Sequence, residues 1–180
     1  MLNKIIVAGF GGQGIIVGAK MLAVTLMRDG KEVTHFPSYG AEMRGGTCNC
    51  FVVTSDKPIA SPMVKISDVA MIFNKPSKAK FEPNIKKGGI MILNKSLIDE
   101  DASRDDITTY YVDATNIADE LGSAKATNMV MFGAFAKATG LVSLESLIGA
   151  LKYTFPKMKD ELFELNKKAL TAGFEKAYTK

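Results

Sequence analysis

Residues 8–14 read Ala-Gly-Phe-Gly-Gly-Gln-Gly, and this stretch decides the fold expected for the chain. It follows an apolar run at residues 5–8 that is typical of a short buried strand. It precedes a second apolar run, at residues 15–27, that has the length of a helix. A strand, a glycine-rich turn and a helix in this order give such a motif a structural meaning.

The glycines of this turn fit the pattern G-x-G-x-x-G at Gly9, Gly11 and Gly14, and Gly12 adds a fourth. Glycine permits a tight turn and the close approach of another group. The backbone N–H groups of Gly12, Gln13 and Gly14 are expected at a helix N-terminus, where an anion is favoured. The turn either binds an anion or only connects a strand to a helix.

Two familiar nucleotide sites do not fit the residues that follow. A dinucleotide site adds an acidic residue about 20 positions after the glycines, at the end of the second strand. Here the second expected strand, residues 32–36, carries Glu32 at its start, and Pro37 is expected to end it. A P-loop needs Gly-Lys-Ser/Thr, which is absent. Any anion would therefore be held by backbone N–H groups, with Gln13 as one amide donor.

The rest of the chain alternates between strand and helix patterns. Strands are expected at residues 5–8, 32–36, 47–54, 69–73, 90–93 and 107–112. Helices are expected at residues 15–27, 76–85 (broken), 114–121, 127–139, 144–153 and 157–178. This alternation predicts an α/β fold, with a mostly parallel sheet, helices on both faces and a helical C-terminal segment. No linker interrupts it, so we expect a single domain over residues 1–180.

Composition narrows the class of protein. Of the 180 residues, 47% are hydrophobic and 23% charged, which is enough for a full core. The net charge is +4, and Lys and Arg are scattered, which argues against a nucleic-acid partner. We read neither a membrane span nor a signal-peptide cleavage site in the sequence. We therefore expect a cytoplasmic protein with no membrane contact.

The two cysteines, Cys48 and Cys50, lie two apart on an expected strand and so share one face. A metal site would need further Cys or His ligands, and the only histidine is His35. Two thiols cannot hold an iron–sulfur cluster within this chain. We interpret both cysteines as small buried residues and His35 as structural, and we predict no metal site.

Three polar residues deserve separate interpretation. Glu42 and Arg44 lie in a glycine-rich loop after the second strand, at the end that faces the ligand crevice of an open parallel sheet. They form either part of a binding site or an ion pair that stabilises the loop. Asn128 precedes a buried helical run and is expected to be an N-cap or a satisfied polar group.

Two segments together resemble the gamma subunit of 2-oxoacid:ferredoxin oxidoreductases. They are Gly-Phe-Gly-Gly-Gln-Gly at residues 9–14 and Pro-Ser-Tyr-Gly-Ala-Glu-Met-Arg-Gly-Gly at residues 37–46. Later segments fit as well, among them Asn-Lys-Pro-Ser at residues 74–77 and Asn-Met-Val at residues 128–130. The resemblance covers most of the chain, and the joint occurrence of the two loops makes it specific.

This resemblance implies a Rossmann-like gamma subunit. The enzymes of this family oxidatively decarboxylate a 2-oxoacid, join the acyl group to coenzyme A and reduce ferredoxin. The resemblance places thiamine diphosphate, Mg and [4Fe-4S] clusters on partner subunits, with coenzyme A as co-substrate. It implies alpha and beta catalytic subunits, a ferredoxin-like delta subunit and ferredoxin as partners. The isolated chain would bind no cofactor and supply no catalytic residue. The residues expected on the coenzyme A side are Gly9, Gly11, Gly12, Gln13, Gly14, Ser38, Tyr39, Glu42 and Arg44.

The second loop also bears on the substrate. Met43 and Gly46 resemble the 2-oxoglutarate and branched-chain types, whereas pyruvate types tend to have Glu-Arg-Arg-Gly-Ala. The resemblance therefore favours 2-oxoglutarate, with pyruvate, 2-oxoisovalerate and an indolepyruvate-type relative as alternatives. A stand-alone nucleotide-binding or redox-sensing domain, or a structural subunit with an empty loop, is a further alternative.

Overall fold

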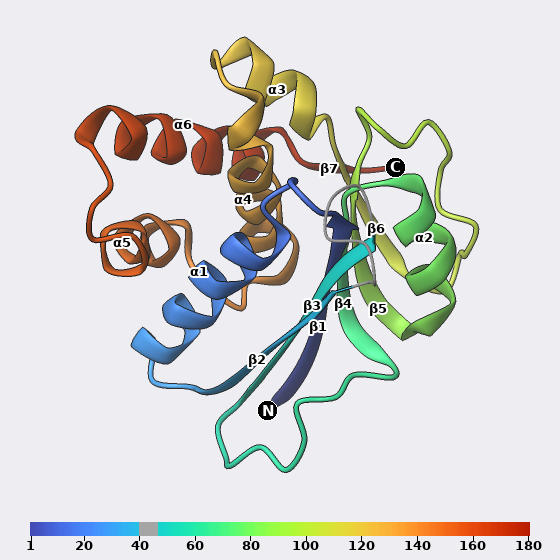
Figure 1. Ribbon diagram of the computed structural model, residues 1–180. Helices are drawn as coiled ribbons and strands as arrows, with labels where there is room; N and C mark the ends of the chain where they lie inside the picture. Colours follow the sequence, from blue (N-terminus) through green and yellow to red (C-terminus); the bar gives the residue numbers. More distant parts are fainter. Residues whose placement is uncertain (40–46) are drawn as a thin grey trace.

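The computed structural model describes residues 1–39 and 47–180, and a single sheet organises this part of the chain (Figure 1). Its seven strands follow the order β2-β3-β1-β4-β5-β6-β7. Their bounds are β1 (Leu2–Phe10), β2 (Glu32–Tyr39), β3 (Thr47–Ser55), β4 (Ser67–Ile72), β5 (Ile85–Asn94), β6 (Thr108–Val112) and β7 (Tyr178–Thr179).

The centre of the sheet is parallel. Strands β1, β4, β5 and β6 pair in parallel, each with the next. Strand β3 is antiparallel to both β1 and β2, so β2 points in the same direction as β1. Strand β7 is antiparallel to β6. The α/β fold with a mostly parallel sheet is thus confirmed, and β3 and β7 are its reversed strands.

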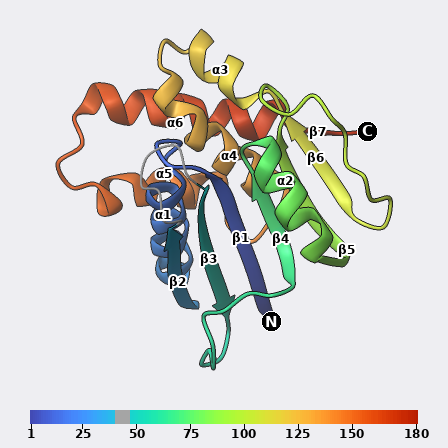
Figure 2. The ribbon, with the colours of Figure 1, turned by 45° about the vertical axis from the view of Figure 1, so that its right-hand side comes forward.

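Helices cover both faces of the sheet, but unequally. The described helices are α1 (Ile15–Arg28), α2 (Lys75–Phe81), α3 (Ala114–Glu120), α4 (Thr127–Thr139), α5 (Leu144–Thr154) and α6 (Asp160–Lys176), with 3-10 turns η1 (Glu82–Asn84) and η2 (Ala124–Ala126). One face carries α1 and α4 with α3, α5 and α6 around them, and the other carries α2 (Figure 2). No described helix is long and apolar enough to cross a membrane.

Side chains of β1 point alternately into two hydrophobic cores, one on each face of the sheet. Ile5 and Val7 belong to the larger apolar cluster, beneath α1 and α4, whereas Ile6 and Ala8 belong to the smaller cluster beneath α2. All four are almost completely buried. Because both faces of this strand are apolar, the central strand reads as a continuous hydrophobic run, as is usual in a covered parallel sheet.

Helices α4 and α6 pack with their backbones in contact. A Cβ atom at Gly133 would overlap the carbonyl oxygen of Leu170, and one at Gly173 would overlap the carbonyl oxygen of Val130. Neither obstacle is a flexible side chain, so the two glycines are required by the close approach of the helices. Helix α4 lies between α6 and the sheet, and most residues of α4 are buried there.

Several predicted element boundaries are wrong, among them the end of the second strand and the end of the last helix. Strand β2 continues through Pro37 to Tyr39, because it is an edge strand, where a proline is tolerated. The last helix ends at Lys176, and the chain then becomes extended and forms β7. Tyr178 of β7 packs on the ring of Tyr111 in β6, with ring centroids 5.7 Å apart. This contact stabilises an extended C-terminal segment over a further turn of α6.

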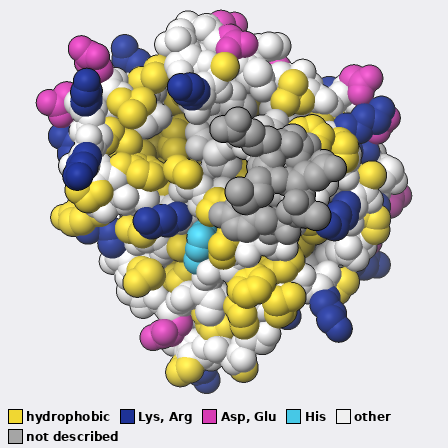
Figure 3. Space-filling view, in the orientation of Figure 1, with side chains coloured by type: hydrophobic (Ala, Val, Ile, Leu, Met, Phe, Trp, Pro, Cys, Tyr) yellow, Lys and Arg dark blue, Asp and Glu magenta, His cyan; other side chains and the backbone are white. Residues whose placement is uncertain are grey.

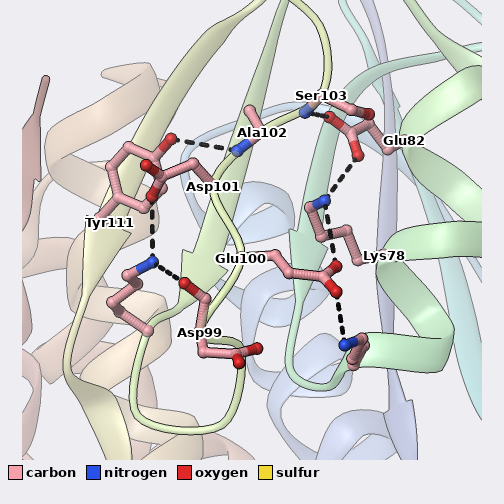
Figure 4. Close-up of polar contacts among 10 residues, drawn as sticks. Lys78, Glu82, Asp99, Glu100, Asp101, Ala102, Ser103 and Tyr111 are labelled. Carbon is pink, nitrogen blue, oxygen red and sulfur yellow. Dashed lines mark hydrogen bonds and ion pairs between the residues drawn. The ribbon is translucent and has the colours of Figure 1, made fainter.

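The acidic stretch at residues 99–106, after β5, is linked to α2 by ion pairs (Figure 4). Lys78 lies with its Nζ 3.3 Å from Glu82 Oε2 and 3.8 Å from Glu100 Oε2. Glu82 also accepts a hydrogen bond of 2.6 Å from the backbone N–H of Ser103. The side chains of Lys78 and Glu82 are only 8% and 4% exposed, so this ion pair is buried.

Candidate ligand site at the glycine turn

The glycine turn lies between the end of β1 and the start of α1. Gly12 has φ 97° and Gly14 has φ 72°, both in the left-handed region that favours glycine. Gly14 is the N-cap of α1 and offers no side-chain cap. The first N–H groups of α1 are therefore left uncapped by a side chain, which is the arrangement that suits an anion.

Gly9 serves packing at the base of the turn. A Cβ atom there would lie 2.8 Å from Ile15 Cδ1 and 2.9 Å from Phe73 Cβ, both closer than normal contacts. Gly9 is buried, so its backbone is covered by its neighbours rather than presented to a ligand. Its contribution to the site is the shape of the turn.

Gln13 has a fixed amide orientation. Its Oε1 accepts hydrogen bonds from the backbone N–H of Phe10, at 2.7 Å, and from Asn74 Nδ2, at 3.3 Å. Because both partners are donors, they hold the oxygen inward and leave the Nε2 group as a donor for the cavity that Gln13 lines. The amide-donor role of Gln13 stays a prediction, with which these two hydrogen bonds are compatible.

Asn128 braces the turn from α4. Its Nδ2 donates to the carbonyl oxygen of Gly14 at 3.3 Å, and its Oδ1 accepts from the N–H of Met129 at 2.9 Å. A Cβ atom at Gly14 would overlap the Asn128 amide, so only glycine fits beneath it. The N-cap of α4 is Ala126, so of the two expected roles Asn128 has that of a satisfied polar group.

A cavity of about 440 Å³ opens beside the turn. Its lining combines the turn with the segment after β5, the starts of α3 and α4, and η2. The described lining residues are Gly12, Gln13, Gly14, Val17, Leu97, Thr115, Ala124, Lys125 and Thr127. None of these carries a negative charge, and Lys125 supplies a positive one.

Lys125 and Thr115 are site residues that the sequence analysis missed. Lys125 lies on η2, is exposed, and forms no ion pair with any described residue. Thr115 Oγ1 accepts from Asn94 Nδ2 at 3.0 Å, which leaves its hydroxyl hydrogen to donate elsewhere. Both residues lie about 100 positions from the glycine turn in the sequence and reach it only in the folded chain. No local sequence motif therefore marks them as part of the site.

The strand register places the end of β2, after which the second loop begins, at the same end of the sheet as the glycine turn. Gly9 pairs with Cys48, and Cys48 pairs with Tyr39, so the end of β2 lies two strands from the glycine turn. Ser38 lies one position earlier, opposite Asn49. Residues 40–46, which include the predicted Glu42 and Arg44, lie outside the described residues, as does the side chain of Tyr39.

The register also bears on the argument against a dinucleotide. Glu32 pairs with Ser55, and Ser55 pairs with Leu2, at the start of β1. Glu32 therefore lies at the opposite end of the strands from the glycine turn. It is too far along β2 to contact a ribose bound at the turn. This placement agrees with the sequence-based exclusion of an NAD-type site.

The cysteines are buried in the apolar core beneath α1. Burial raises the pKa of the Cys48 thiol, and it raises the pKa of the Cys50 thiol to about 12. Both are free thiols. Among the described residues no group of three or more His, Cys, Asp or Glu side chains is placed to hold a metal ion. The raised pKa values keep both thiols protonated at neutral pH, as buried core residues.

The sequence model of the family described as pyruvate ferredoxin/flavodoxin oxidoreductase matches residues 4–176. Ketoisovalerate oxidoreductase subunit VorA of Methanothermobacter marburgensis is 36% identical over 94% of this chain, which spans only 35% of that protein. The 2-oxoglutarate synthase subunit KorC of Methanocaldococcus jannaschii is 35% identical over 98% of this chain and 95% of its own length.

A solved structure extends the likeness to three dimensions. It is the 2-oxoglutarate:ferredoxin oxidoreductase from Magnetococcus marinus with 2-oxoglutarate, coenzyme A and succinyl-CoA bound. The fold superposes with a TM-score of 0.88 at 27% identity, over 97% of this chain and 30% of the longer one. The same domain therefore occurs both as a stand-alone subunit and as about a third of a longer polypeptide.

Proposed function

Because the chain belongs to the pyruvate ferredoxin/flavodoxin oxidoreductase family, we propose that it is the gamma subunit of a 2-oxoacid:ferredoxin oxidoreductase. The complex would oxidatively decarboxylate a 2-oxoacid in the cytoplasm, form an acyl-coenzyme A and reduce ferredoxin. Thiamine diphosphate, Mg and the [4Fe-4S] clusters would reside on the alpha, beta and delta subunits. This chain would be inactive alone. A relative of equal length that is itself a subunit supports the proposal.

We take 2-oxoglutarate as the substrate of this complex. A 2-oxoglutarate synthase subunit matches along its whole length, and the solved relative is a 2-oxoglutarate enzyme. The ketoisovalerate relative is equally similar in sequence. Met43 and Gly46 of the second loop resemble both of these types and argue only against pyruvate, so the choice of 2-oxoglutarate rests on the full-length match and the solved relative. The test is the rate of ferredoxin reduction by the purified complex with each acid. Faster turnover of pyruvate or 2-oxoisovalerate would overturn this choice.

The cavity beside the glycine turn is our proposed site for a phosphate group of coenzyme A. The observation that carries this proposal is a convergence of donors: the N-terminus of α1, the Gln13 amide, the Thr115 hydroxyl and the Lys125 ammonium. Charge-assisted hydrogen bonds to an anion are roughly twice as strong as neutral ones. None of the described lining residues is acidic, so no carboxylate among them would repel an anion bound to these donors.

The second loop would complete the site from the end of β2. Ser38, Tyr39, Glu42 and Arg44 follow or end a strand whose last residues lie two strands from Gly9. Arg44 would add a second cation to that of Lys125. In this arrangement the buried Gly9 would only shape the base of the turn, and Gly11, Gly12 and Gly14 would let its backbone approach the ligand closely.

The Michaelis constant for coenzyme A in the reconstituted complex tests the site, with the constant for the 2-oxoacid as control. Gly12→Asp places a carboxylate where the anion belongs, and Gly12→Asn is its neutral match at the same left-handed backbone position. Lys125→Glu and Lys125→Gln form a second pair. We expect the acidic member of each pair to raise the coenzyme A constant about tenfold over its neutral match.

Equal coenzyme A constants within both pairs would show that the cavity receives no anion. The glycines would then serve only the turn. The broader proposal has its own test: the isolated chain should be colourless and inactive, and adding it to the other subunits should restore coenzyme A-dependent ferredoxin reduction. A brown isolated chain, or a complex equally active without it, would contradict the assignment as a gamma subunit.

A further inference from the structure

The face of the sheet that carries α2 is only half covered. Helix α2 contacts β4 and β1 and stands in front of the β4 side of the sheet, and none of the described helices lies before β3 and β2 on this face (Figure 2). Phe51 and Val53 of β3 are nonetheless buried, in the same apolar cluster as Val64 of the β3–β4 connection. The opposite face is covered by helices on both sides of the centre. We name the part of this face that stays exposed, along β2 and at the start of β1, together with its border at the β3–β4 connection, the open face.

Apolar side chains remain exposed on the open face and at its lower border. Phe36 of β2 is 40% exposed and stacks on Phe51 of β3, with ring centroids 6.4 Å apart. Leu2 of β1 is 49% exposed, and Met63 of the β3–β4 connection is 53% exposed. Hydrophobic side chains also gather in the lower half of the face seen in Figure 3. A sheet face that meets water normally carries polar residues instead.

A groove of about 330 Å³ runs along the border of this face. Leu2, Val53, Ile59 and Met63 supply its apolar lining, and Lys4 lies among them. Grooves of this kind, beside exposed apolar side chains, mark surfaces that bind another protein. The groove thus offers an anchor point for an apolar side chain of a partner.

The relatives indicate what covers such a face. In subunit VorA and in the Magnetococcus marinus enzyme this domain is 35% and 30% of a longer chain. The remaining two-thirds of those chains must pack against the domain at some surface. The described helices of this chain leave part of the α2 face without a cover. Leu2, Phe36 and Met63 of the open face are among the large hydrophobic side chains that remain exposed.

We propose that the open face docks a catalytic subunit, the separate chain that corresponds to the remainder of the fused relatives. This inference rests on the proposed function. Lys57 and Lys65 are exposed in the connection that borders the groove, and neither forms an ion pair with a described residue. The neighbouring Asp56 is already paired with Lys31 and the N-terminus. The partner surface should therefore be apolar at its centre and acidic at its rim.

Association with the co-expressed catalytic subunits tests the proposal. Leu2→Glu and Met63→Glu each bring a charge into the open face. Leu162→Glu is the matched control, since Leu162 is 47% exposed on α6, which packs against α4 on the other side of the sheet. The dissociation constant of the complex is measured by dilution and native mass spectrometry. We expect about a tenfold weakening or more for the two open-face variants and no change for the control.

The isolated variants should retain the unfolding temperature of the unmodified chain, which separates lost docking from lost folding. Folded open-face variants that associate normally would overturn the inference and leave the proposed function intact. Failure of the unmodified chain to associate with catalytic subunits would overturn the proposed function itself. A dimer of the unmodified chain that both open-face variants abolish would assign the face to a second copy and overturn the proposed occupant.

Discussion

The side-chain Nδ2 of Asn128 donates to the carbonyl oxygen of Gly14 at 3.3 Å and so joins residues 114 positions apart. Asn128 is buried at the start of α4, and Gly14 begins α1. A hydrogen bond between the first turns of two helices fixes how the glycine turn faces the cavity. The geometry of the candidate site therefore depends on a residue that does not line it.

Asn128→Asp should destabilise the chain and distort the turn. The carboxylate cannot donate to Gly14 and would face a carbonyl oxygen in a buried position. We expect the free energy of unfolding to fall by about 1–3 kcal/mol, the usual effect of an unpaired buried polar group. Denaturant titration measures the loss. Asn128→Ala, which removes the donor without adding charge, should cost less, and equal losses would show that charge plays no part.

Gly173→Ala should be among the most damaging small substitutions in the chain. The new methyl group would overlap the backbone carbonyl of Val130, so α4 and α6 would have to separate. Overpacking of this kind costs about 1–3 kcal/mol. Gly149→Ala in α5 is the matched control, because a Cβ atom there meets nothing within 4 Å. It should stabilise the chain by up to about 1 kcal/mol through helix propensity. Effects of the same sign would contradict this packing.

Lys78→Met should be far more costly than the removal of an exposed lysine. It leaves Glu82, whose side chain is 4% exposed, without its buried counter-ion. Breaking a buried pair in this way costs about 3–5 kcal/mol. Lys152→Met is the control, because Lys152 and its partner Asp160 are 58% and 91% exposed, and such pairs contribute about 0–1 kcal/mol. The measurement is the unfolding free energy of each variant relative to the unmodified chain. Similar decreases for the two variants would mean that the buried pair contributes no more stability than a surface pair.

Local patterns predicted the centre of this structure because its determinants are local. The strand, glycine turn and helix around Gly9 and Gly14 follow from apolar runs on either side of residues with free backbone conformation. The end of β2 was misjudged, because tolerance of Pro37 depends on the position of β2 at the edge of the sheet. Edge position is a property of the assembled sheet, not of the residues beside the proline.

The candidate site could be predicted only in part for the same reason. The sequence identified the turn, but Lys125 comes from a short 3-10 turn whose residues carry no motif. The need for glycine at positions 133 and 173 arises where two helices cross, and periodicity along one helix gives no sign of it. Long-range packing supplied these features, and only the three-dimensional arrangement shows them.

The Cys50 thiol should be unreactive in the folded chain and should make stability depend on alkaline pH. Burial raises its pKa to about 12, from an ordinary value of 9.0. The folded state therefore keeps this proton after the unfolded state has lost it. The stabilisation is fully present below pH 9 and is lost as the pH rises from 9 to 12.

Two measurements check this expectation. At pH 8 a thiol reagent should label Cys48 and Cys50 slowly in the folded chain and rapidly in guanidinium chloride. Between pH 9 and 11 the unfolding free energy of Cys50→Ala should fall less steeply than that of the unmodified chain. The lysines titrate in the same range but are common to both proteins, so they cancel in the comparison. Parallel pH profiles, or rapid labelling without denaturant, would show that the thiol is accessible and that the core beneath α1 opens readily.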